Sequence, residues 1–588
     1  MSEPSSIPPR FNDQIYLTTS ARVEGQGGHL RRDEQDLRWS RLVADSLSYM
    51  NRILSKIVRP ESWARAGIRL TRQWHTAWYQ QRVDCLYDKL GPVTNGAGPQ
   101  TIVADGLWDN PNHFFRLRLF LEALPGIETM RLVGVLGQAD DRTRLSLERL
   151  GFTEFVAIND HPRHRTETFR SRARTMLAGV QRHADILDLP LPAGLPAYIY
   201  YDTVLKLARH PQPGLDNPLW ESTLAECLRN CAIYRDLLET IPVTQVIVSH
   251  PWKNEFATLM WASLTRSVPA HHLTGYCEGI RVRRFLDTAD YATPVEHLSL
   301  SEFDALPATV RQKLSADGAR YLEQRELGRG TDLNVRYAYR QRFKAPSRNE
   351  ARHALGVIGP RKLVVIYSHV WFDFPHTFAM RNFTDFFDWM RRTMEEVRAI
   401  PELDWVLKPH PTENWYGGFR LQDMAGELPP HVRLAPQNAD SLTALTAADI
   451  VVTAHGTVGL EAAAHGLPVI AADRSFYSDW GFVHQAVSQE HYIRLLRTAR
   501  DLPAPDEAGR QRALALISLA LAPTPTEVGL IEMRCDSSGP ALYKDILNRY
   551  AENDPALARE RECLRAWLAD PSSSYAAHIK TSHFRNAG

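Results

Sequence analysis

Short, unbroken runs of apolar residues recur along the chain from residue 101 onward, and stretches with helical spacing separate them. A run of this kind is typical of a strand that is buried on both faces of a parallel sheet. Strands that alternate with helices predict a parallel sheet with crossover connections. The first half of the chain predicts strands at 101–104, 130–136, 154–158, 243–248 and 273–277, and helices at 113–124, 142–150, 166–184 and 219–239.

The same pattern restarts after a polar stretch at 300–350, where we expect the link between two domains. It again predicts a doubly wound α/β domain, with buried strands joined by helices. The expected strands lie at 362–367, 405–407 and 432–435 and begin near 450 and 469, and the expected helices lie at 379–400, 441–448 and 458–465.

Both ends of the chain are predicted to be largely helical. Residues 1–34 lack periodicity and predict a loose leader, whereas residues 35–90 carry apolar positions at helical spacing. A chain of 588 residues is also too long for a single core. We therefore predict four parts: 1–99, leader and helical extension; 100–335, a first Rossmann-like, acceptor domain; 336–505, a second Rossmann-like domain that binds a nucleotide-sugar; and 506–588, a helical tail.

Composition and charge exclude several classes of protein. Hydrophobic residues make up 44% of the chain and charged residues 23%, as in an ordinary soluble protein. The formal net charge of +1 gives no overall field that favours nucleic acid or an anionic membrane. Six scattered cysteines predict reduced thiols. With no apolar run of about 18 residues, we expect a cytoplasmic protein, and peripheral contact with the inner membrane stays open.

Histidines follow directly after several predicted strands, at His161, His250, His369, His410 and His455. A single histidine of this kind is more often an ordinary loop residue, but five at equivalent positions favour a site. The carboxyl ends of parallel strands meet at one sheet edge, and imidazoles there can donate to phosphate or transfer protons near neutral pH. Their spacing matches no metal-binding motif, so we expect no metal.

The turn before the predicted helix at 458–465 carries a second signal. Gly456 and Thr457 open that helix, and backbone N–H groups at a helix N-terminus bind phosphate oxygens. The alternative is a tight strand–helix turn without a ligand.

Two acidic residues also follow predicted strands, and each precedes a glycine. They are Asp105 and Glu278. A carboxylate at this position can act as a general base for an acceptor hydroxyl or as a nucleophile. It can equally be a helix N-cap or a turn residue. The sequence favours neither role over the other.

Two motifs in the second half resemble a known bacterial pattern: Lys408-Pro409-His410-Pro411, and His455-Gly456-Thr457 followed by Glu461 and Gly466-Leu467-Pro468. The pattern resembles the His-Pro motif of capsule and lipopolysaccharide glycosyltransferases, including Kdo transferases. More distantly, it is similar to bacterial sialyltransferases and CDP-glycerol glycerophosphotransferases. The resemblance covers about 362–481. It implies a GT-B-like α/β fold, in which two Rossmann-like doubly wound domains face a cleft.

The resemblance also implies roles for individual residues. His410, as an imidazolium, would contact the nucleotide phosphate and stabilise the leaving group. Thr457 would bind the same phosphate, and Glu461 would reach the ribose hydroxyls. A base or nucleophile would come from Asp105 or Glu278. The remaining expected contacts are Ser368, His369, Lys408, Thr412, His455 and Gly456 for the donor and His250 for the acceptor. The family more often has a Ser/Thr-rich turn where this chain has Ala454-His455-Gly456.

The implied activity is a glycosyltransferase of bacterial surface polysaccharide biosynthesis, for capsule or lipopolysaccharide. It would transfer a sugar, with Kdo from CMP-Kdo as the first choice, to a glycan or glycolipid acceptor. No cofactor is expected, because the nucleotide-sugar is a substrate. The alternatives are a CDP-alditol phosphotransferase, a UDP-sugar 2-epimerase, or a non-catalytic scaffold of envelope assembly. Nucleic acid is not expected as a partner, and contact with an assembly complex stays open.

Overall fold

The computed structural model describes residues 88–586, apart from gaps at 95, 97, 110, 275–279, 293–296, 330–334, 336–337, 340–343, 379, 414–417, 437–438, 524–549, 551–553 and 573. The predictions for residues 1–87, and for the acidic residue Glu278, lie outside these residues. All described residues belong to one contact unit, Asp84–Ser537 together with Leu542–Gly588.

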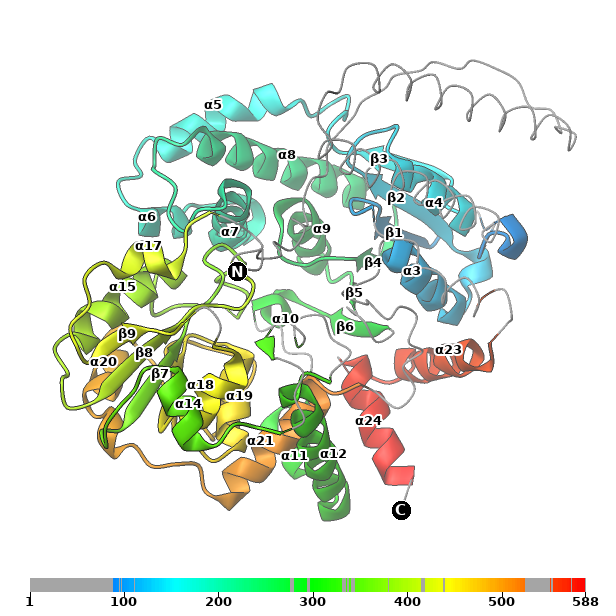
Figure 1. Cartoon of the computed structure of the whole chain (residues 1–588). Coiled ribbons are helices and arrows are strands. Elements are labelled where there is room, and N and C mark those ends of the chain that lie inside the picture. The colour runs from blue at the N-terminus through cyan, green and yellow to red at the C-terminus, as the bar shows by residue number, and fades with distance from the viewer. Residues whose placement is uncertain are drawn as a thin grey trace, which may run out of the picture. The chain divides into compact units, whose positions relative to one another are not determined.

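Six strands between residues 101 and 285 form the first sheet (Figure 1). Their order in space is β3-β2-β1-β4-β5-β6, and all neighbours are parallel except β5 and β6. This is the strand order of a Rossmann fold, in which the winding reverses between the first and fourth strands. The strands are β1 (Thr101–Asp105), β2 (Arg131–Leu136), β3 (Glu154–Ala157), β4 (Val243–Val248), β5 (Ala270–Thr274) and β6 (Arg281–Phe285).

Helices connect these strands, as the alternating pattern predicts. The predicted helix at 166–184 is two helices, α5 and α6, with Gly179 between them. The predicted strand at 273–277 begins three residues earlier, and β6 is not predicted. The helices of this half are α3 (Pro111–Ala123), α4 (Arg142–Leu150), α5 (Thr166–Leu177), α6 (His183–Leu187), α7 (Ala197–Ala208), α8 (Pro218–Thr240), α9 (Asn254–Leu264) and α10 (Thr288–Ala292).

The second sheet repeats the same topology with six parallel strands, in the order β12-β11-β10-β7-β8-β9. Counted from β7, this is again the Rossmann order, so the predicted α/β class with two Rossmann-like domains is confirmed. The strands are β7 (Leu363–Tyr367), β8 (Asp404–Lys408), β9 (Val432–Leu434), β10 (Ile450–Thr453), β11 (Val469–Ala471) and β12 (His484–Gln485).

The helices of the second half differ from the prediction at two places. α15 starts at Phe386 rather than 379, because the described residues between β7 and Phe386 form a long loop. The described part of the polar stretch at 300–350 is largely helical. The domain boundary near 335 stays a prediction. The helices are α11 (Leu300–Asp304), α12 (Ala308–Glu326), α14 (Arg348–Ala354), α15 (Phe386–Val397), α17 (Leu421–Ala425), α18 (Ser441–Ala447), α19 (Thr457–Ala464) and α20 (Gln489–Arg497).

The predicted helical tail is present as α21 (Glu507–Ala520), α23 (Pro555–Leu568) and α24 (Tyr575–Asn586). α21 packs along α12, α23 along α3, and α24 against β6. The approach of α21 to α12 is closest at Gly318, where a Cβ atom would lie 1.8 Å from the carbonyl oxygen of Leu514. Only a hydrogen fits there, so glycine is what allows these two helices to touch.

The loop after β7 is bonded to helix α7 of the first half. His376 Nδ1 lies 2.7 Å from Asp202 Oδ1, and the backbone N–H of His376 donates to Asp202 Oδ2 at 3.0 Å. Lys206 pairs with Asp373 at 2.5 Å, also between α7 and this loop. The loop that follows the central strand of the second sheet is therefore tied to a helix of the first half by charged contacts.

We expect Gly318→Ala to lower the free energy of unfolding by about 1–3 kcal/mol, as overpacking does. The loss should occur although alanine is the better helix former, because the added methyl meets a backbone carbonyl that cannot rotate away. Thermal or urea unfolding measures it. The control is Gly179→Ala, where an added Cβ meets no atom within 4 Å. Equal stability of the two variants would contradict the close approach.

The His376–Asp202 pair predicts a pH-dependent stability. Burial alone would lower the pKa of His376, but Asp202, as a charge and as a hydrogen-bond acceptor, outweighs burial and, with Asp385 and Asp473, raises this pKa above its ordinary 6.5. A raised folded-state pKa stabilises the fold below the unfolded pKa, and this stabilisation is lost as the pH rises through the folded pKa. We expect the stability advantage of wild type over Asp202→Asn to shrink as the pH rises above 6.5, measured by thermal unfolding.

The control variant for this prediction is Lys206→Gln. It breaks the neighbouring Lys206–Asp373 pair, which contains no histidine. Its stability difference from wild type should stay constant over the same range. A constant difference for Asp202→Asn as well would show that His376 does not titrate there.

Candidate functional site

The second sheet reverses its winding between β7 and β10, which pair with Tyr367 opposite Thr453. On its other side β7 pairs with β8, and Lys408 lies opposite Tyr367. Open parallel sheets bind ligands outside the carboxyl ends of their strands at such a reversal. The predicted residues that follow these three strand ends form what we call the switch-point cluster: Ser368, His369, His410, His455, Gly456 and Thr457.

Thr453 is the last residue of β10, and its side chain links the turn after β10 to a residue that follows β7. Its Oγ1 accepts a hydrogen bond from the backbone N–H of Gly456 at 3.0 Å and lies 3.2 Å from Nε2 of His369. The backbone N–H of His455 also points at this Nε2, at 3.5 Å. A nitrogen that accepts in this way has no proton, so the His369 proton sits on Nδ1.

Gly456 leaves no room for a side chain. A Cβ atom there would lie 2.9 Å from Thr453 Oγ1 and 3.4 Å from the His369 ring. Gly456 is the N-cap of α19, and no side chain caps this helix or places an acid in its first turn. The first N–H groups of a helix lack internal partners and carry the positive end of its dipole. The start of α19, at the half-buried Thr457, therefore favours an anion.

Two buried polar atoms of the cluster have no hydrogen-bond partner among the described residues. They are Oγ of Ser368, a residue 4% exposed, and Nδ1 of His455, a residue 7% exposed. Buried polar atoms are nearly always paired in folded proteins, and an unpaired one calls for an explanation. Both atoms can donate a hydrogen bond. A ligand with acceptor oxygens at the start of α19 would supply the missing partners.

Aromatic rings bury the two histidines that flank this turn. The His369 ring stacks on Phe386 with centroids 4.3 Å apart, and it meets the His455 ring edge-on at 4.8 Å. Phe378 and Phe386 also contact His455, at 5.1 and 5.0 Å. Burial lowers the pKa of His369 well below its ordinary value, and His455 and His410 lower it further. Burial and the neighbouring His376 lower the pKa of His455 to about 3. Both imidazoles are neutral.

His410 follows β8 and is positioned by Thr412. Its Nδ1 accepts from the backbone N–H of Thr412 at 3.3 Å and lies 2.9 Å from the Thr412 hydroxyl. Burial lowers the pKa of His410 to about 4, against the opposing effect of Asp373, and Lys408 lowers it further. The expected imidazolium is therefore a neutral imidazole in this structure, with its proton on Nε2. Thr412 holds His410 in place here, and its predicted contact with the donor stays a prediction.

Lys408 ends β8 and is almost completely buried, with its ammonium 3.1 Å from the carbonyl oxygen of Pro409. Burial lowers its pKa to about 8, although Asp440 and Glu413 act in the opposite direction. It is the one predicted donor contact that carries a titratable positive charge near neutral pH.

Glu461 lies in α19 but turns into the protein. The side chain is 2% exposed; Arg325 Nε donates to its Oε1 at 2.7 Å, and the Tyr339 hydroxyl donates to its Oε2. In this structure the carboxylate links α19 to α12. A ribose hydroxyl would have to share the Glu461 carboxylate with Arg325 and Tyr339. The predicted contact with the ribose stays a prediction.

The first sheet also reverses its winding, between β1 and β4, and Asp105 lies at this point. The residue is 0% exposed, and its carboxylate accepts from the backbone N–H of Ser249 at 2.5 Å and from the Ser249 hydroxyl at 2.9 Å. It joins the ends of the two strands and exposes no atom to a substrate. The structure therefore favours the turn-residue role of Asp105 over the catalytic one.

His250 follows β4 and contacts the loop of the second half. Its ring lies 5.5 Å from the Phe374 ring, and its Nδ1 accepts from the backbone N–H of Trp252 at 3.3 Å. Burial, and then the charges of His272 and Lys206, lower the pKa of His250 to about 3, while Asp373 opposes them. Asp373 acts on His410 in the same way. The Asp373 carboxylate thus opposes the fall in pKa of both histidines: His250, the predicted acceptor contact, and His410, the predicted leaving-group contact.

Sequence reasoning missed two residues that shape the site. Thr453 looked like the end of an apolar run, although its hydroxyl joins His369 to Gly456. Asp473, after β11, accepts from the backbone N–H groups of Arg381 and Asn382 and so fixes the loop before α15. A polar residue at the carboxyl end of a predicted strand was the available signal in both cases.

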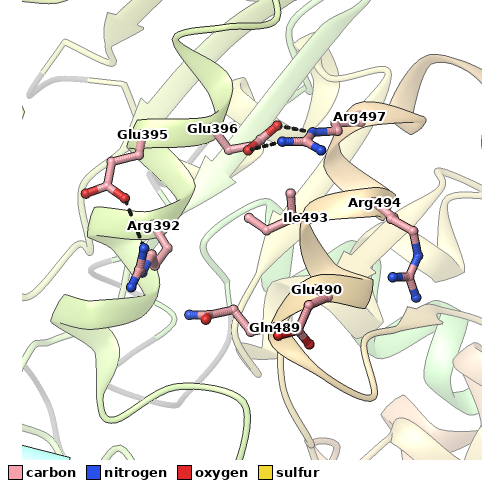
Figure 2. A pocket seen from close by; sticks show the side chains of 8 residues that line it. All are labelled: Arg392, Glu395, Glu396, Gln489, Glu490, Ile493, Arg494 and Arg497. Carbon is pink, nitrogen blue, oxygen red and sulfur yellow. Dashed lines mark hydrogen bonds and ion pairs between the residues drawn. The ribbon is translucent and has the colours of Figure 1, made fainter.

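A surface hollow of about 360 Å³ lies between α15 and α20 (Figure 2). Its lining includes the Arg497–Glu396 ion pair and none of the predicted site residues. Within the described part of the chain, no group of three or more His, Cys, Asp or Glu side chains could hold a metal ion. Independence from metals stays a prediction. None of the described helices is long and apolar enough to cross a bilayer.

Comparisons with known proteins give no family. No protein-family model matches the chain, and no curated protein matches it. Among solved structures it is similar to the KpsC beta Kdo 2,4 transferase of Thermosulfurimonas dismutans, at 16% identity and a TM-score of 0.31 over 47% of this chain and 79% of that one. It is also similar to the UDP-GlcNAc 2-epimerase of Neisseria meningitidis, at 10% identity and a TM-score of 0.22 over 77% and 100%. At such TM-scores these likenesses carry no argument, and the fold assignment rests on the strand orders.

Proposed function

We propose that the chain is a GT-B-type glycosyltransferase of bacterial surface polysaccharide assembly, which transfers a sugar from a nucleotide-sugar. Two observations at one place support the proposal. The uncapped start of α19 lies at the switch point, and two buried hydrogen-bond donors near it, Ser368 Oγ and His455 Nδ1, have no partner among the described residues. A nucleotide phosphate would satisfy all of them. On the resemblance of the Lys-Pro-His-Pro and His-Gly-Thr motifs, CMP-Kdo is the donor that we favour.

In this proposal His410 acts as a neutral hydrogen-bond donor. When the bond between the anomeric carbon and the phosphate oxygen breaks, its electron pair stays on that oxygen, and negative charge grows there. The Nε2–H of His410 donates to this oxygen, and the bond strengthens as the charge develops. The growing anion also raises the pKa of the imidazole, because it stabilises the protonated form. His410 thus favours the transition state over the bound donor.

The acceptor side needs a group that removes a proton. The acceptor hydroxyl oxygen attacks the anomeric carbon, and its proton must pass to a base. Asp105 exposes no atom, and a pKa of about 3 makes His250 a poor proton acceptor. We therefore assign the base to Glu278 and the positioning of the acceptor to His250.

Nucleotide binding is tested by thermal stabilisation with CMP, CDP, UDP and GDP. A nucleotide at about 100 times its dissociation constant should add about 2.7 kcal/mol to the stability. We expect CMP to stabilise wild type and the effect to be largely lost in His410→Ala and in Ser368→Ala, because each removes one phosphate donor.

The control is His353→Ala, which removes an exposed histidine of α14, and it should respond to CMP as wild type does. Preference for UDP or CDP would replace the CMP-Kdo assignment by the epimerase or the alditol phosphotransferase. No response to any nucleotide would contradict the proposed function and favour the scaffold.

The lowered pKa of Lys408 predicts a pH dependence of nucleotide affinity. Lys408 is charged below its pKa of about 8 and neutral above it. Because a bound phosphate gains from the positive charge, we expect the affinity to fall as the pH rises through 8 and beyond. Titration calorimetry across this range measures it. Lys408→Arg, which keeps its charge, should show no such fall. A fall of the same size in Lys408→Arg would assign it to another group.

A further inference from the structure

One segment of the first half is strongly basic in a chain that is otherwise close to neutral. Residues 163–182 contain six arginines and one glutamate, hence a formal charge of +5, whereas the whole chain carries +1. The segment leaves the carboxyl end of β3 and forms helix α5, which packs along α8 (Figure 1). The positive charge is therefore local, on the same sheet edge as Asp105 and His250.

Three of the six arginines pair within the protein, namely Arg182 with Asp185 at 2.8 Å and two arginines of α5, and three do not. Arg170 pairs with Glu167 at 3.0 Å, and Arg174 pairs with Glu221 of α8 at 2.8 Å. Arg163, Arg165 and Arg172 are exposed, and none of them forms an ion pair with any residue that the structure describes. Pairing within the protein thus accounts for one group and leaves the other available.

Two of the unpaired arginines, Arg165 and Arg172, lie on one face of α5 together with two threonines. Arg165 is the N-cap, and Thr168, Arg172 and Thr175 follow at intervals of three, four and three residues. Residues at these intervals share a helix face, and all four are exposed. We call them the arginine stripe. It contains no acidic side chain, and its two arginines are about 10 Å apart along the axis.

The start of the stripe is held rigidly. Arg229, a buried residue of α8, donates to Asn159 Oδ1 at 2.9 Å and to Thr166 Oγ1 at 2.5 Å. His164 Nε2 lies 2.7 Å from Asp236 Oδ2, also on α8. The loop before α5 is therefore fixed at both ends, so little backbone entropy is lost when a ligand binds beside it.

The composition of the stripe favours one kind of ligand. Guanidinium groups pair with carboxylates or phosphates, and threonine hydroxyls bond to sugars and anions alike. None of the large hydrophobic residues that are exposed in the described part of the chain lies on α5. A helix that lies on a membrane inserts such residues, and single-stranded nucleic acid needs exposed aromatic rings for stacking. An extended anionic glycan requires neither.

We infer that the arginine stripe binds a linear anionic polysaccharide, which contacts Arg165 and Arg172 through separate acidic groups. β3 is two strands from β1, roughly 10 Å across the sheet, so a chain on the stripe can extend toward the switch point of the first sheet. That this polymer is the acceptor rests on the proposed function, whereas its binding to the stripe does not.

The test compares two double variants that remove the same charge. Arg165→Gln with Arg172→Gln removes the stripe, and Arg170→Gln with Arg174→Gln removes the paired arginines beside it. The probe is a fluorescent polygalacturonate oligomer, followed by anisotropy at low and physiological salt, with neutral dextran as the blank. We expect the stripe variant to bind about tenfold more weakly than wild type, and the matched variant to stay within about twofold.

Three other outcomes would overturn the inference. Equal losses in both variants would show attraction by net charge alone. Binding to phosphatidylglycerol vesicles but not to the polymer would assign the stripe to a membrane surface, and no binding to either would leave it without a ligand. Stabilisation by CMP should be unchanged in the stripe variant. If no nucleotide stabilises wild type but the polymer still binds through the stripe, the proposed function fails and the stripe stands.

Discussion

The connections of β7 and β10 leave the second sheet on opposite faces, and the candidate site depends on this constraint. β7 leads to β8 on one side and β10 to β11 on the other, and right-handed crossovers then place the two following helices on different layers. Neither connection can cover both strand ends. The start of α19 and the residues after β7 therefore lie together at the reversal, where open parallel sheets bind their ligands. The first sheet obeys the same rule, with Asp105 and Ser249 at its reversal.

Strands that are buried on both faces could be predicted from the sequence because their apolar runs are unbroken, as in β7 and β10. β6 could not, because three of its five residues are arginines. Two of these guanidiniums are paired far along the chain: Arg281 donates to the carbonyl oxygens of Ala520 and Ala522, and Arg284 to that of Asp570. A local pattern cannot show partners that are more than two hundred residues away. The loop before α15 is predicted as helix for a similar reason, since it is held by Asp473, which follows the distant strand β11.

The sequence also located the histidines of the site, because the end of a buried strand is visible in the pattern. It could not show their charge. The rings of Phe378 and Phe386 surround His455 and exclude water, and this burial makes the imidazole neutral. Nor could it show that Glu461 is taken up by Arg325 and Tyr339. The positions of the site residues follow from the strand order. The protonation of the histidines and the pairing of Glu461 follow from tertiary packing.

The contacts between the tail and β6 impose an order on synthesis. β6 is the edge strand of the first sheet, and Ser574 pairs with Arg283 on it, so the tail covers an edge that could otherwise recruit another strand. A ribosome makes residues 101–285 long before residue 574. The nascent first sheet must therefore wait, with this edge open, until residue 574 has been translated. During that interval, chaperones or rapid synthesis must keep the open edge of β6 from pairing with another chain.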